Sequence, residues 1–225
     1  MTATIIPITP AVPDPPELDA ILWQGFHETV TAYDVGANCG QTIETIRGFA
    51  ATVVAFEPSI EAFTYLSERY EIEDGYVLSN LAVSCVSGHV DLVAAPGKIE
   101  TGQLVTAGTP GMEWSGAADG GEVRSLLCIT LDDYATATNL WPGFLKIDVE
   151  GHEGRVLQGA TRILETKPEM LIEIHSEALG SAIYDLLKKD YHVEQVLHPH
   201  YPRGSLLSRT HFWFRCFPLV RSSEV

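Results

Sequence analysis

The chain has 225 residues, of which 45% are hydrophobic and 20% charged, proportions typical of a globular protein with one sizeable core. Its formal net charge of -16, with only 14 lysine and arginine residues, argues against a nucleic-acid partner, because phosphate backbones require clustered positive charge. No apolar run approaches the roughly twenty residues that cross a bilayer, and the four scattered cysteines form no C-x-x-C pair, so we expect a reduced, cytoplasmic protein without a membrane span.

The first eighteen residues contain five prolines and neither lysine nor arginine, which predicts an extended arm rather than a secretion signal. A short helix could follow over residues 18–27, with Trp23 and Phe26 packed against a sheet. We therefore expect an arm and short helix over residues 1–27 and one folded domain over residues 28–220.

An apolar run over Thr29–Val35 predicts a buried strand, and Gly36 and Gly40 follow it in a turn before a helical pattern. Backbone amides in such a turn can approach a ligand closely, because glycine has no Cβ and the helix start has unpaired N–H groups. The three glycines of the dinucleotide fingerprint are missing, and Asp34 would repel a phosphate but attract an ammonium or sulfonium. The loop therefore favours a cationic amino-acid moiety, such as that of S-adenosylmethionine (SAM).

The helix after this loop should carry Ile43, Ile46 and Ala50 on one face. A second buried strand, Thr52–Phe56, then ends in Glu57. In doubly wound folds that bind nucleosides, a carboxylate at the end of the second strand accepts hydrogen bonds from the ribose hydroxyls. A glutamate at a strand end is otherwise simply solvated, so the prediction of a nucleoside site rests on its spacing from the first loop.

Ser59 should cap the next helix, whose apolar residues fall on one face: Ile60, Phe63, Leu66 and Tyr70. A third strand over Tyr76–Leu78 leaves Asn80 and Ala82 at its carboxyl end, where ligands of open parallel sheets bind. These two residues are candidates for the adenine side of the pocket, and a polar loop without a ligand is the alternative for Asn80.

Residues 89–93 alternate in polarity as a half-buried antiparallel strand does. From Pro96 to Gly121 the periodicity is lost and seven glycines accumulate, which is too long for an ordinary connection. We expect this insert, residues 96–121, to be either a lid over the acceptor side or disordered. Val123–Leu131 returns to a strand pattern, and Leu131 and Asp132 should open a short helix.

Phe144–Ile147 predicts a fourth parallel strand, and Asp148, Glu150 and His152 follow directly after it. Ionisable groups at this position are costly unless water, a cation or a substrate satisfies them. The remaining predicted elements are a helical stripe, a strand that ends in His175, a helix and two strands: residues 156–164, 170–174, 178–187, 192–197 and 211–216.

Methyl transfer from a sulfonium to a hydroxyl is an in-line displacement, which needs accurate positioning and a base or a metal facing the methyl group. Asp148, Glu150, His152 and His175 are the candidate catalytic residues. We favour His175 as the base because imidazole titrates near neutral pH, although a single histidine at a strand end can also be structural. Asp148 and Glu150 with a neighbour could instead hold a divalent cation, since hard cations take oxygen ligands.

In this order, five sequence blocks make the chain resemble the FkbM family of SAM-dependent methyltransferases: Asp34–Gly40, Phe56–Pro58, Leu131–Asp133, Leu145–Gly151, and Lys167–Pro168 with Glu173. The resemblance implies a class I methyltransferase domain, an α/β Rossmann-like, doubly wound seven-stranded sheet with its last strand antiparallel. It also implies O-methylation of a small-molecule acceptor, such as a sugar, a glycosylated metabolite or a polyketide. With the two residues after the third strand, the predicted SAM pocket comprises Asp34, Gly36, Asn38, Gly40, Glu57, Pro58, Asn80 and Ala82.

Two other kinds of protein are compatible with parts of this pattern. An NAD(P)-dependent oxidoreductase would share the fold, yet it should show the third glycine that this loop lacks. A catalytically silent SAM-binding module would keep Asp34 and Glu57 but would need no charged group over residues 148–150. Neither the acceptor nor the oligomeric state follows from the sequence.

Overall fold

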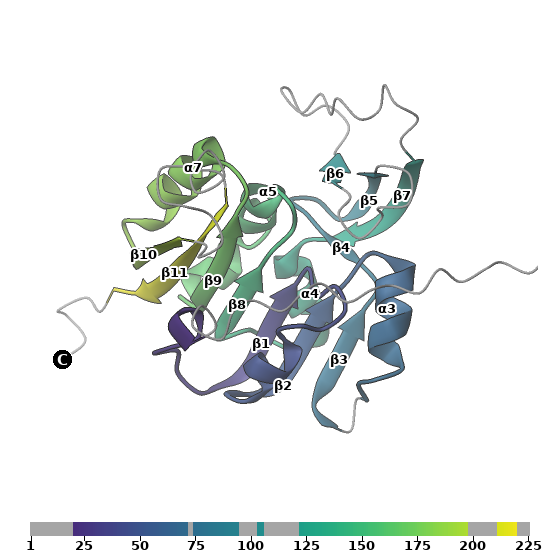
Figure 1. Ribbon diagram of the computed structural model, residues 1–225, viewed down its shortest axis with the longest axis horizontal. Helices are drawn as coiled ribbons and strands as arrows, with labels where there is room; N and C mark the ends of the chain where they lie inside the picture. Colours follow the sequence, from purple (N-terminus) through teal and green to yellow (C-terminus); the bar gives the residue numbers. More distant parts are fainter. Residues whose placement is uncertain (1–19, 72–73, 95–102, 106–121, 198–210, 220–225) are drawn as a thin grey trace, which may run out of the picture.

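The computed structural model describes residues 20–71, 74–94, 103–105, 122–197 and 211–219. Its main feature is a seven-stranded sheet in the order β10-β11-β9-β8-β1-β2-β3 (Figure 1). The strands in chain order are β1 Thr29–Val35, β2 Ala50–Phe56, β3 Tyr76–Ser79, β8 Phe144–Ile147, β9 Glu169–Ile174, β10 Tyr191–Leu197 and β11 Phe212–Pro218. All seven lie where apolar runs of the sequence predict strands.

The strand directions are those of a class I methyltransferase sheet. β1 is parallel to both β2 and β8, and the pairs β2–β3 and β8–β9 are parallel too. β11, the last strand, is antiparallel to both of its neighbours, β9 and β10. The predicted fold class is therefore confirmed. Because the chain order reverses between β1 and β8, the ligand crevice of such a sheet lies at the carboxyl ends of these two strands.

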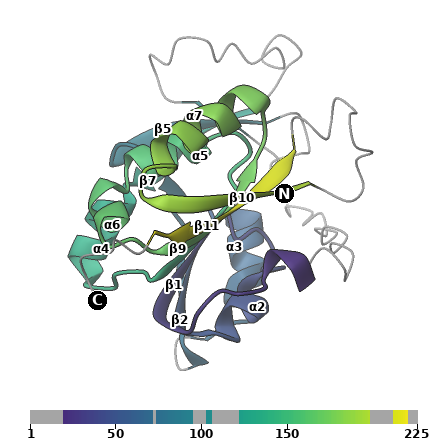
Figure 2. The same ribbon diagram turned by 90° about the vertical axis from the view of Figure 1, so that its left-hand side faces the viewer.

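Helices cover both faces of the sheet (Figure 2). On one side lie a helical turn at residues 20–22 and the helices α2 Ile43–Arg47 and α3 Ile60–Ser67. On the other side lie α4 Leu131–Thr138, α5 Glu153–Gln158, α6 Thr161–Glu165 and α7 Glu177–Leu187. Within the described residues, no helix is long and apolar enough to cross a membrane.

The core is divided by the sheet, and alternate residues of each strand belong to different halves. In β1, Tyr33 and Val35 pack with residues of α4 to α7, whereas Ala32 packs with residues of α2 and α3. Strands buried on both faces carry continuous apolar runs instead of alternating ones, which is why these strands are legible in the sequence.

A second sheet of four strands lies beside the first, in the order β4-β7-β5-β6. Its strands are β4 Ala82–Val83, β5 Gly88–Ala94, β6 Gln103–Val105 and β7 Glu122–Ile129. β5 is antiparallel to both β6 and β7, as its alternating pattern predicts. β6 falls inside the insert, so these three residues are ordered as a strand although the sequence shows no periodicity there, and the rest of the insert lies outside the described residues.

The helical stripe predicted over residues 156–164 is two helices, because α5 ends at Gln158, with Gly159 as its C-cap, and α6 begins at Thr161. A Cβ on Gly159 would lie 2.3 Å from the carbonyl oxygen of Ser84, the residue after β4, so no side chain fits here. Sequence periodicity shows the shared apolar face of the two helices but not the break, where the Asp132 carboxylate accepts hydrogen bonds from the Arg162 and Ile163 amides at the start of α6.

Smaller corrections concern residues at element boundaries. Ala50 begins β2 instead of extending α2, and Ile60 is 53% exposed although it begins α3 as expected. The helix cap before α4 is Thr130, whose side chain accepts a hydrogen bond from the Asp133 amide, so β7 ends two residues earlier than predicted. Among the described residues of the predicted first helix, 20–27, residues 20–22 are helical, and the proline-rich arm lies outside the described residues.

Candidate active site

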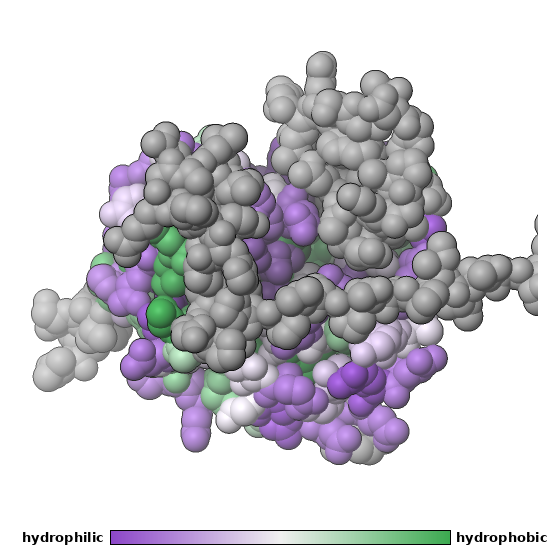
Figure 3. Space-filling model, viewed as in Figure 1, coloured by the Kyte–Doolittle hydropathy of each residue, from purple (hydrophilic) through white to green (hydrophobic). Residues whose placement is uncertain are grey.

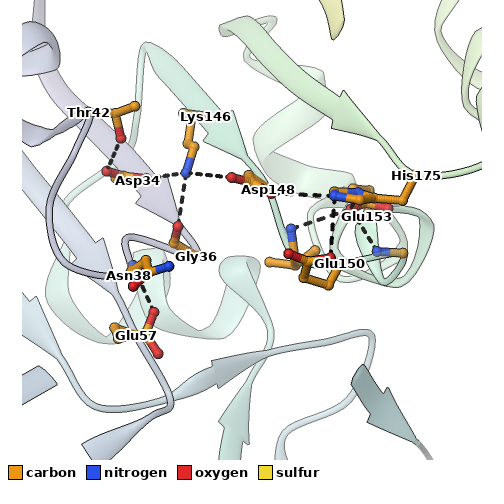
Figure 4. A network of polar contacts seen from close by, with 12 residues as sticks. Asp34, Gly36, Asn38, Thr42, Glu57, Lys146, Asp148, Glu150, Glu153 and His175 are labelled. Carbon is orange, nitrogen blue, oxygen red and sulfur yellow. Dashed lines mark hydrogen bonds and ion pairs between the residues drawn. The ribbon is translucent and has the colours of Figure 1, made fainter. Parts of the chain in front are cut away.

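Polar side chains from four neighbouring parallel strands meet at the carboxyl edge of the main sheet (Figure 4). A glycine turn follows β1, Glu57 follows β2, Asp148 follows β8, and His175 follows β9. The described surface between α5 and β4, beside this edge, is mainly hydrophilic (Figure 3). The structure thus brings together residues that lie far apart in the sequence.

Gly36 begins the turn after β1 with a φ of +80°, and its lack of a side chain serves the packing of β1 against β8. A Cβ at this position would lie 1.8 Å from the backbone oxygen of Asp148. The amides of Gly36 and Ala37 both donate to the carbonyl oxygen of Phe56, at 3.0 Å each. These two amides are therefore taken up by the protein, so they are not the amides through which the turn could bind a ligand.

The other residues of the turn are fixed by α3 and β2. Gly40 has a φ of +85°, and a Cβ there would lie 2.9 Å from Leu66 and 3.0 Å from Tyr70. Asn38 has a φ of +47°, in the left-handed region that asparagine tolerates better than most residues. Its amide donates to Glu57 Oε2 at 2.8 Å, so the turn is tied directly to the end of β2.

Asp34 is fully buried behind the turn. Its Oδ2 accepts a hydrogen bond from the Thr42 hydroxyl at 2.8 Å, and its Oδ1 lies 3.2 Å from Lys146 Nζ. The carboxylate already has a cationic partner and no accessible surface, so the structure corrects the expectation that it touches the ligand directly. Asp34 instead holds the helix start and the lysine next to the turn.

Glu57 is held by two backbone amides, one on each carboxylate oxygen. Asn38 N–H donates to Oε2 at 2.8 Å and Ser59 N–H to Oε1 at 2.7 Å, and the side chain is 7% exposed. Burial raises the pKa of Glu57 to about 7, because its two amide bonds and Lys146 offset the loss of water only in part. A carboxyl group fixed in this way can still accept hydrogen bonds through its remaining lone pairs.

Three predicted pocket residues lie around Glu57. The Asn80 side chain donates to the carbonyl oxygens of Glu57 and Pro58, at 2.8 and 3.2 Å, and so fixes the segment that presents the carboxylate. Pro58 is partly buried next to it. Ala82 is 1% exposed and pairs with Cys128 in the second sheet. Its side chain therefore belongs to the core, and only residues next to it could contact a ligand.

A carboxylate–histidine cluster, defined as Asp148, Glu150, Glu153, Glu173 and His175, occupies the ends of β8 and β9 and the start of α5. His175 Nδ1–H donates to Glu153 Oε1 at 2.7 Å, and its Nε2 lies 3.6 Å from Glu150 and 3.8 Å from Asp148. Glu153 Oε1 also accepts from the amides of Val149 and Gly151, at 3.3 and 3.0 Å. The fully buried Glu153 therefore fixes both the loop after β8 and the histidine.

The excess of carboxylates in this cluster favours protonation. Burial disfavours the charged form of His175, but the hydrogen bond and charge of Glu153, with Asp148 and Glu173, outweigh it and raise its pKa to about 9. Burial and the charge of Asp148 also raise the pKa of Glu173 above its ordinary value. At neutral pH the cluster therefore favours the imidazolium form of His175, which argues against its predicted role as the general base.

Glu150 is the most accessible carboxylate that contacts the histidine, with 43% of its side chain exposed, compared with 29% for Asp148. Its backbone has a φ of +52°, which is uncommon for a residue with a Cβ, and Gly151 follows at +95°. Burial raises its pKa above the ordinary value, and Asp148 and Glu153 add to this. These features suit a carboxylate that accepts a proton from a bound molecule.

Asp148, Glu173 and His175 form a group whose ligand atoms all lie within 4.8 Å of one another. Carboxylate oxygens and imidazole nitrogens are suitable ligands for a divalent cation. The geometry therefore changes the predicted set of ligands, because Glu173 from β9 takes the place that the sequence suggested for Glu150.

His152 caps α5 and does not join the cluster. Its side chain is 2% exposed, and Nε2 is hydrogen-bonded to the Ser84 hydroxyl at 3.0 Å. Burial lowers its pKa to about 4, so the ring is neutral. The prediction of a catalytic role is corrected, because the side chain has no access to an acceptor.

Residues 34–194 match the family model described as the Methyltransferase FkbM domain. The chain belongs to the FkbM methyltransferase family. This FkbM family member is 28% identical over 158 residues to the hexuronic acid methyltransferase AglP of Haloferax volcanii. The match covers 69% of this chain and 60% of AglP, so the chain spans about three fifths of that relative's length.

Solved structures show the same fold at low sequence identity. A methyltransferase FkbM from Methylobacillus flagellatus has a TM-score of 0.54 and 17% identity, and the match covers 84% of this FkbM family member and 44% of that chain. An rRNA methylase from Streptococcus thermophilus has a TM-score of 0.51 and 11% identity, with 91% and 95% covered. A putative methyltransferase from Streptococcus mutans in complex with SAH has a TM-score of 0.50 and 12% identity, with 92% and 99% covered.

Sequence reasoning did not assign site roles to Lys146, Glu153 and Glu173 of this FkbM family member. Lys146 is buried in the middle of an apolar strand, and a charged residue there signals a paired partner. Glu153 is the third residue after Glu150 and begins α5, which indicates a favourable interaction with the helix dipole but not a bond to His175. Glu173 is the polar residue of a buried strand, two positions before His175, which is a signal of the same kind as Lys146.

Proposed function

We propose that this FkbM family member transfers a methyl group from SAM to a hydroxyl group of a sugar or a sugar-bearing small molecule. The observation that carries the proposal is that Glu57, a buried and amide-bound carboxylate suited to ribose, lies on the same sheet edge as the carboxylate–histidine cluster. A nucleoside bound at the end of β2 and a polar acceptor bound at the ends of β8 and β9 would meet over β1, at the switch point of the sheet.

In this proposal Glu57 accepts hydrogen bonds from the ribose hydroxyls. Asn38, Gly36 and Gly40 shape the turn beside it, and the loop that contains Asn80 borders the adenine. The negative charge of Asp34 and of the cluster favours a sulfonium near the turn, although Lys146 neutralises part of it.

The reaction would be an in-line displacement in which the acceptor oxygen attacks the methyl carbon while the carbon–sulfur bond breaks. We assign proton acceptance from the hydroxyl to Glu150, the most accessible carboxylate in contact with His175. The His175 imidazolium would orient Glu150 and Asp148, and Glu153 would orient His175. Positioning supplies much of the acceleration in such a reaction, and a proton acceptor adds a further factor.

A sugar is the favoured acceptor class because AglP, the relative described above, is a hexuronic acid methyltransferase. A polar cluster at the acceptor side suits a ligand with several hydroxyl groups, since each hydroxyl both donates and accepts hydrogen bonds. A divalent cation on Asp148, Glu173 and His175 would acidify a coordinated hydroxyl. It would need His175 Nε2 without a proton, so it is an alternative to the imidazolium arrangement, with its own test.

The test is transfer of a labelled methyl group from SAM to a panel of neutral sugars, uronic acids and glycosylated metabolites. We expect labelled product from at least one sugar, and little product from a Glu57→Gln variant at the same SAM concentration. A variant of the exposed residue Glu177, Glu177→Gln, is the matched control and should behave as the wild type. Failure of the wild-type protein to bind SAM in a calorimetric titration would overturn the proposal.

The same experiments separate the two alternatives from the proposed function. A silent SAM-binding module would bind SAM or S-adenosylhomocysteine (SAH) but would yield no product with any member of the panel. A nicotinamide oxidoreductase would bind NAD(P) instead, which membership of the FkbM methyltransferase family does not support.

A further inference from the structure

Lys146 lies in β8 between the turn after β1 and the carboxylate–histidine cluster, and its side chain is only 4% exposed. Its ammonium group contacts three oxygens from three segments of the chain. These are the Gly36 carbonyl at 2.9 Å, Asp34 Oδ1 at 3.2 Å and Asp148 Oδ2 at 3.4 Å. An ammonium group has three N–H donors, so these contacts can use all of them.

The charge of Lys146 is secured by its partners. Burial lowers the pKa of the ammonium, but Asp34 and Asp148 outweigh burial and raise it above the ordinary value. A buried lysine with one buried carboxylate would already be neutralised. The second carboxylate, Asp148, is 29% exposed and can be solvated by water, so charge balance does not explain why Lys146 reaches it.

Lys146 is also the link in a continuous series of polar contacts that runs from the cofactor side to the acceptor side (Figure 4). In order, the series passes through Glu57, the Asn38 amide, the turn to the Gly36 carbonyl, Lys146, Asp148, His175 and Glu153.

We propose that Lys146 is a positioning residue that couples occupancy of the cofactor turn to the placement of Asp148 at the acceptor edge. The inference rests on the proposed SAM site. A ligand on the turn would shift the Gly36 carbonyl. The Lys146 ammonium would follow it, and its distances to the carboxylates of Asp34 and Asp148 would change. Asp148 would then change its position relative to His175, so the acceptor edge would sense the cofactor without touching it.

The test needs no acceptor, because it follows the acceptor edge by NMR while SAH binds. In the wild-type protein we expect saturating SAH to shift the backbone amide signals of Val149 and Gly151, both of which donate to Glu153. Lys146→Met alone leaves Asp34 buried without a cation, and we expect it to lower the melting temperature strongly. The double variant Asp34→Asn/Lys146→Met removes both charges and should recover most of that loss.

The double variant distinguishes coupling from charge balance. If Lys146 couples the two sides, SAH still binds the double variant, but the shifts of Val149 and Gly151 fall at least about threefold. If Lys146 only balances the charge of Asp34, the double variant regains both its melting temperature and wild-type shifts, and the inference is overturned. Shifts caused directly by nearby SAH would persist in the double variant and so would count against the inference.

Two further variants complete the test. Asp148→Asn breaks the series one contact later and does not disturb the buried Asp34–Lys146 pair. This variant should therefore fold even if the double variant does not. The shift of its Gly151 amide signal on SAH binding should fall as well. Asp185→Asn/Lys188→Met removes an exposed lysine–aspartate pair on α7 and should leave SAH binding and the shifts unchanged. Absence of SAH binding to the wild-type protein would reject the proposed function itself, whereas normal binding with undiminished shifts in Asp148→Asn would reject only the role of Lys146.

Discussion

Replacing Glu153 by glutamine should weaken the dependence of folding stability on pH. Glutamine has nearly the same shape, and its carbonyl oxygen can still accept from the Val149 and Gly151 amides and from His175 Nδ1–H. The change therefore removes a negative charge 2.7 Å from the imidazole and leaves the loop intact. The amide nitrogen would take the place of Glu153 Oε2, a buried atom without a hydrogen-bond partner.

The magnitude follows from the pKa of His175, which rises from 6.5 to about 9 on folding. Because the folded-state pKa is the higher one, the imidazolium stabilises the fold fully below pH 6.5, and this stabilisation is lost as the pH rises through about 9. The difference corresponds to about 3 kcal/mol of unfolding free energy. Glu153 is the main cause of the raised pKa, so Glu153→Gln should remove at least about 1.5 kcal/mol of the pH-dependent part.

The assay is urea unfolding at about pH 6 and about pH 10, in which the difference between the two unfolding free energies is compared across variants. Glu173 changes stability with the same sign, because its folded-state pKa is also raised, and its share should persist in Glu153→Gln. His175→Gln should show the same reduction, and the double variant no further one, since both act on one pair. An unchanged difference in Glu153→Gln would show that Glu153 does not control the charge of His175.

Three further predictions follow from the structure. Because Glu57 has a pKa of about 7, SAM affinity should fall as the pH drops below 7. Glu57→Gln should weaken SAM binding by about 1–3 kcal/mol and remove this pH dependence. The same calorimetric affinity and pH dependence in the wild type and in Glu57→Gln would contradict the ribose assignment. Gly36→Ala should lower the unfolding free energy by about 3 kcal/mol or more, because the new Cβ would meet the backbone oxygen of Asp148. Gly151 has a similar φ but open space around it, so Gly151→Ala should cost about 1 kcal/mol. Urea unfolding measures both changes. If the cluster holds a cation, exhaustive chelation should lower methyl transfer, and added Mg²⁺ or Mn²⁺ should restore it. Full activity after chelation would show that the reaction needs no cation.

The strand pattern of the sheet could be predicted because burial on both faces leaves a direct record in the sequence. β1 has the predicted bounds, and β8 coincides with the apolar run before Asp148. The polar residues that follow these strands could also be located, since the carboxyl ends of parallel strands share one edge of the sheet. Periodicity could not show that the helical stripe is divided at Gly159, because the start of α6 is fixed by hydrogen bonds to Asp132, which lies about thirty residues earlier in the chain.

By itself, the sequence determined which residues stand at the strand ends, because local hydrophobic patterning fixes where each strand stops. Only the tertiary structure decided what those residues do there. Asp34 lies opposite Lys146 in the register of β1 and β8, and this pairing turns an expected ligand contact into a buried ion pair. In the same way, Glu153 reaches His175 only after α5 packs beside β9. Little water screens the charge of Glu153 there, so it raises the pKa of His175, the expected base, and favours the imidazolium.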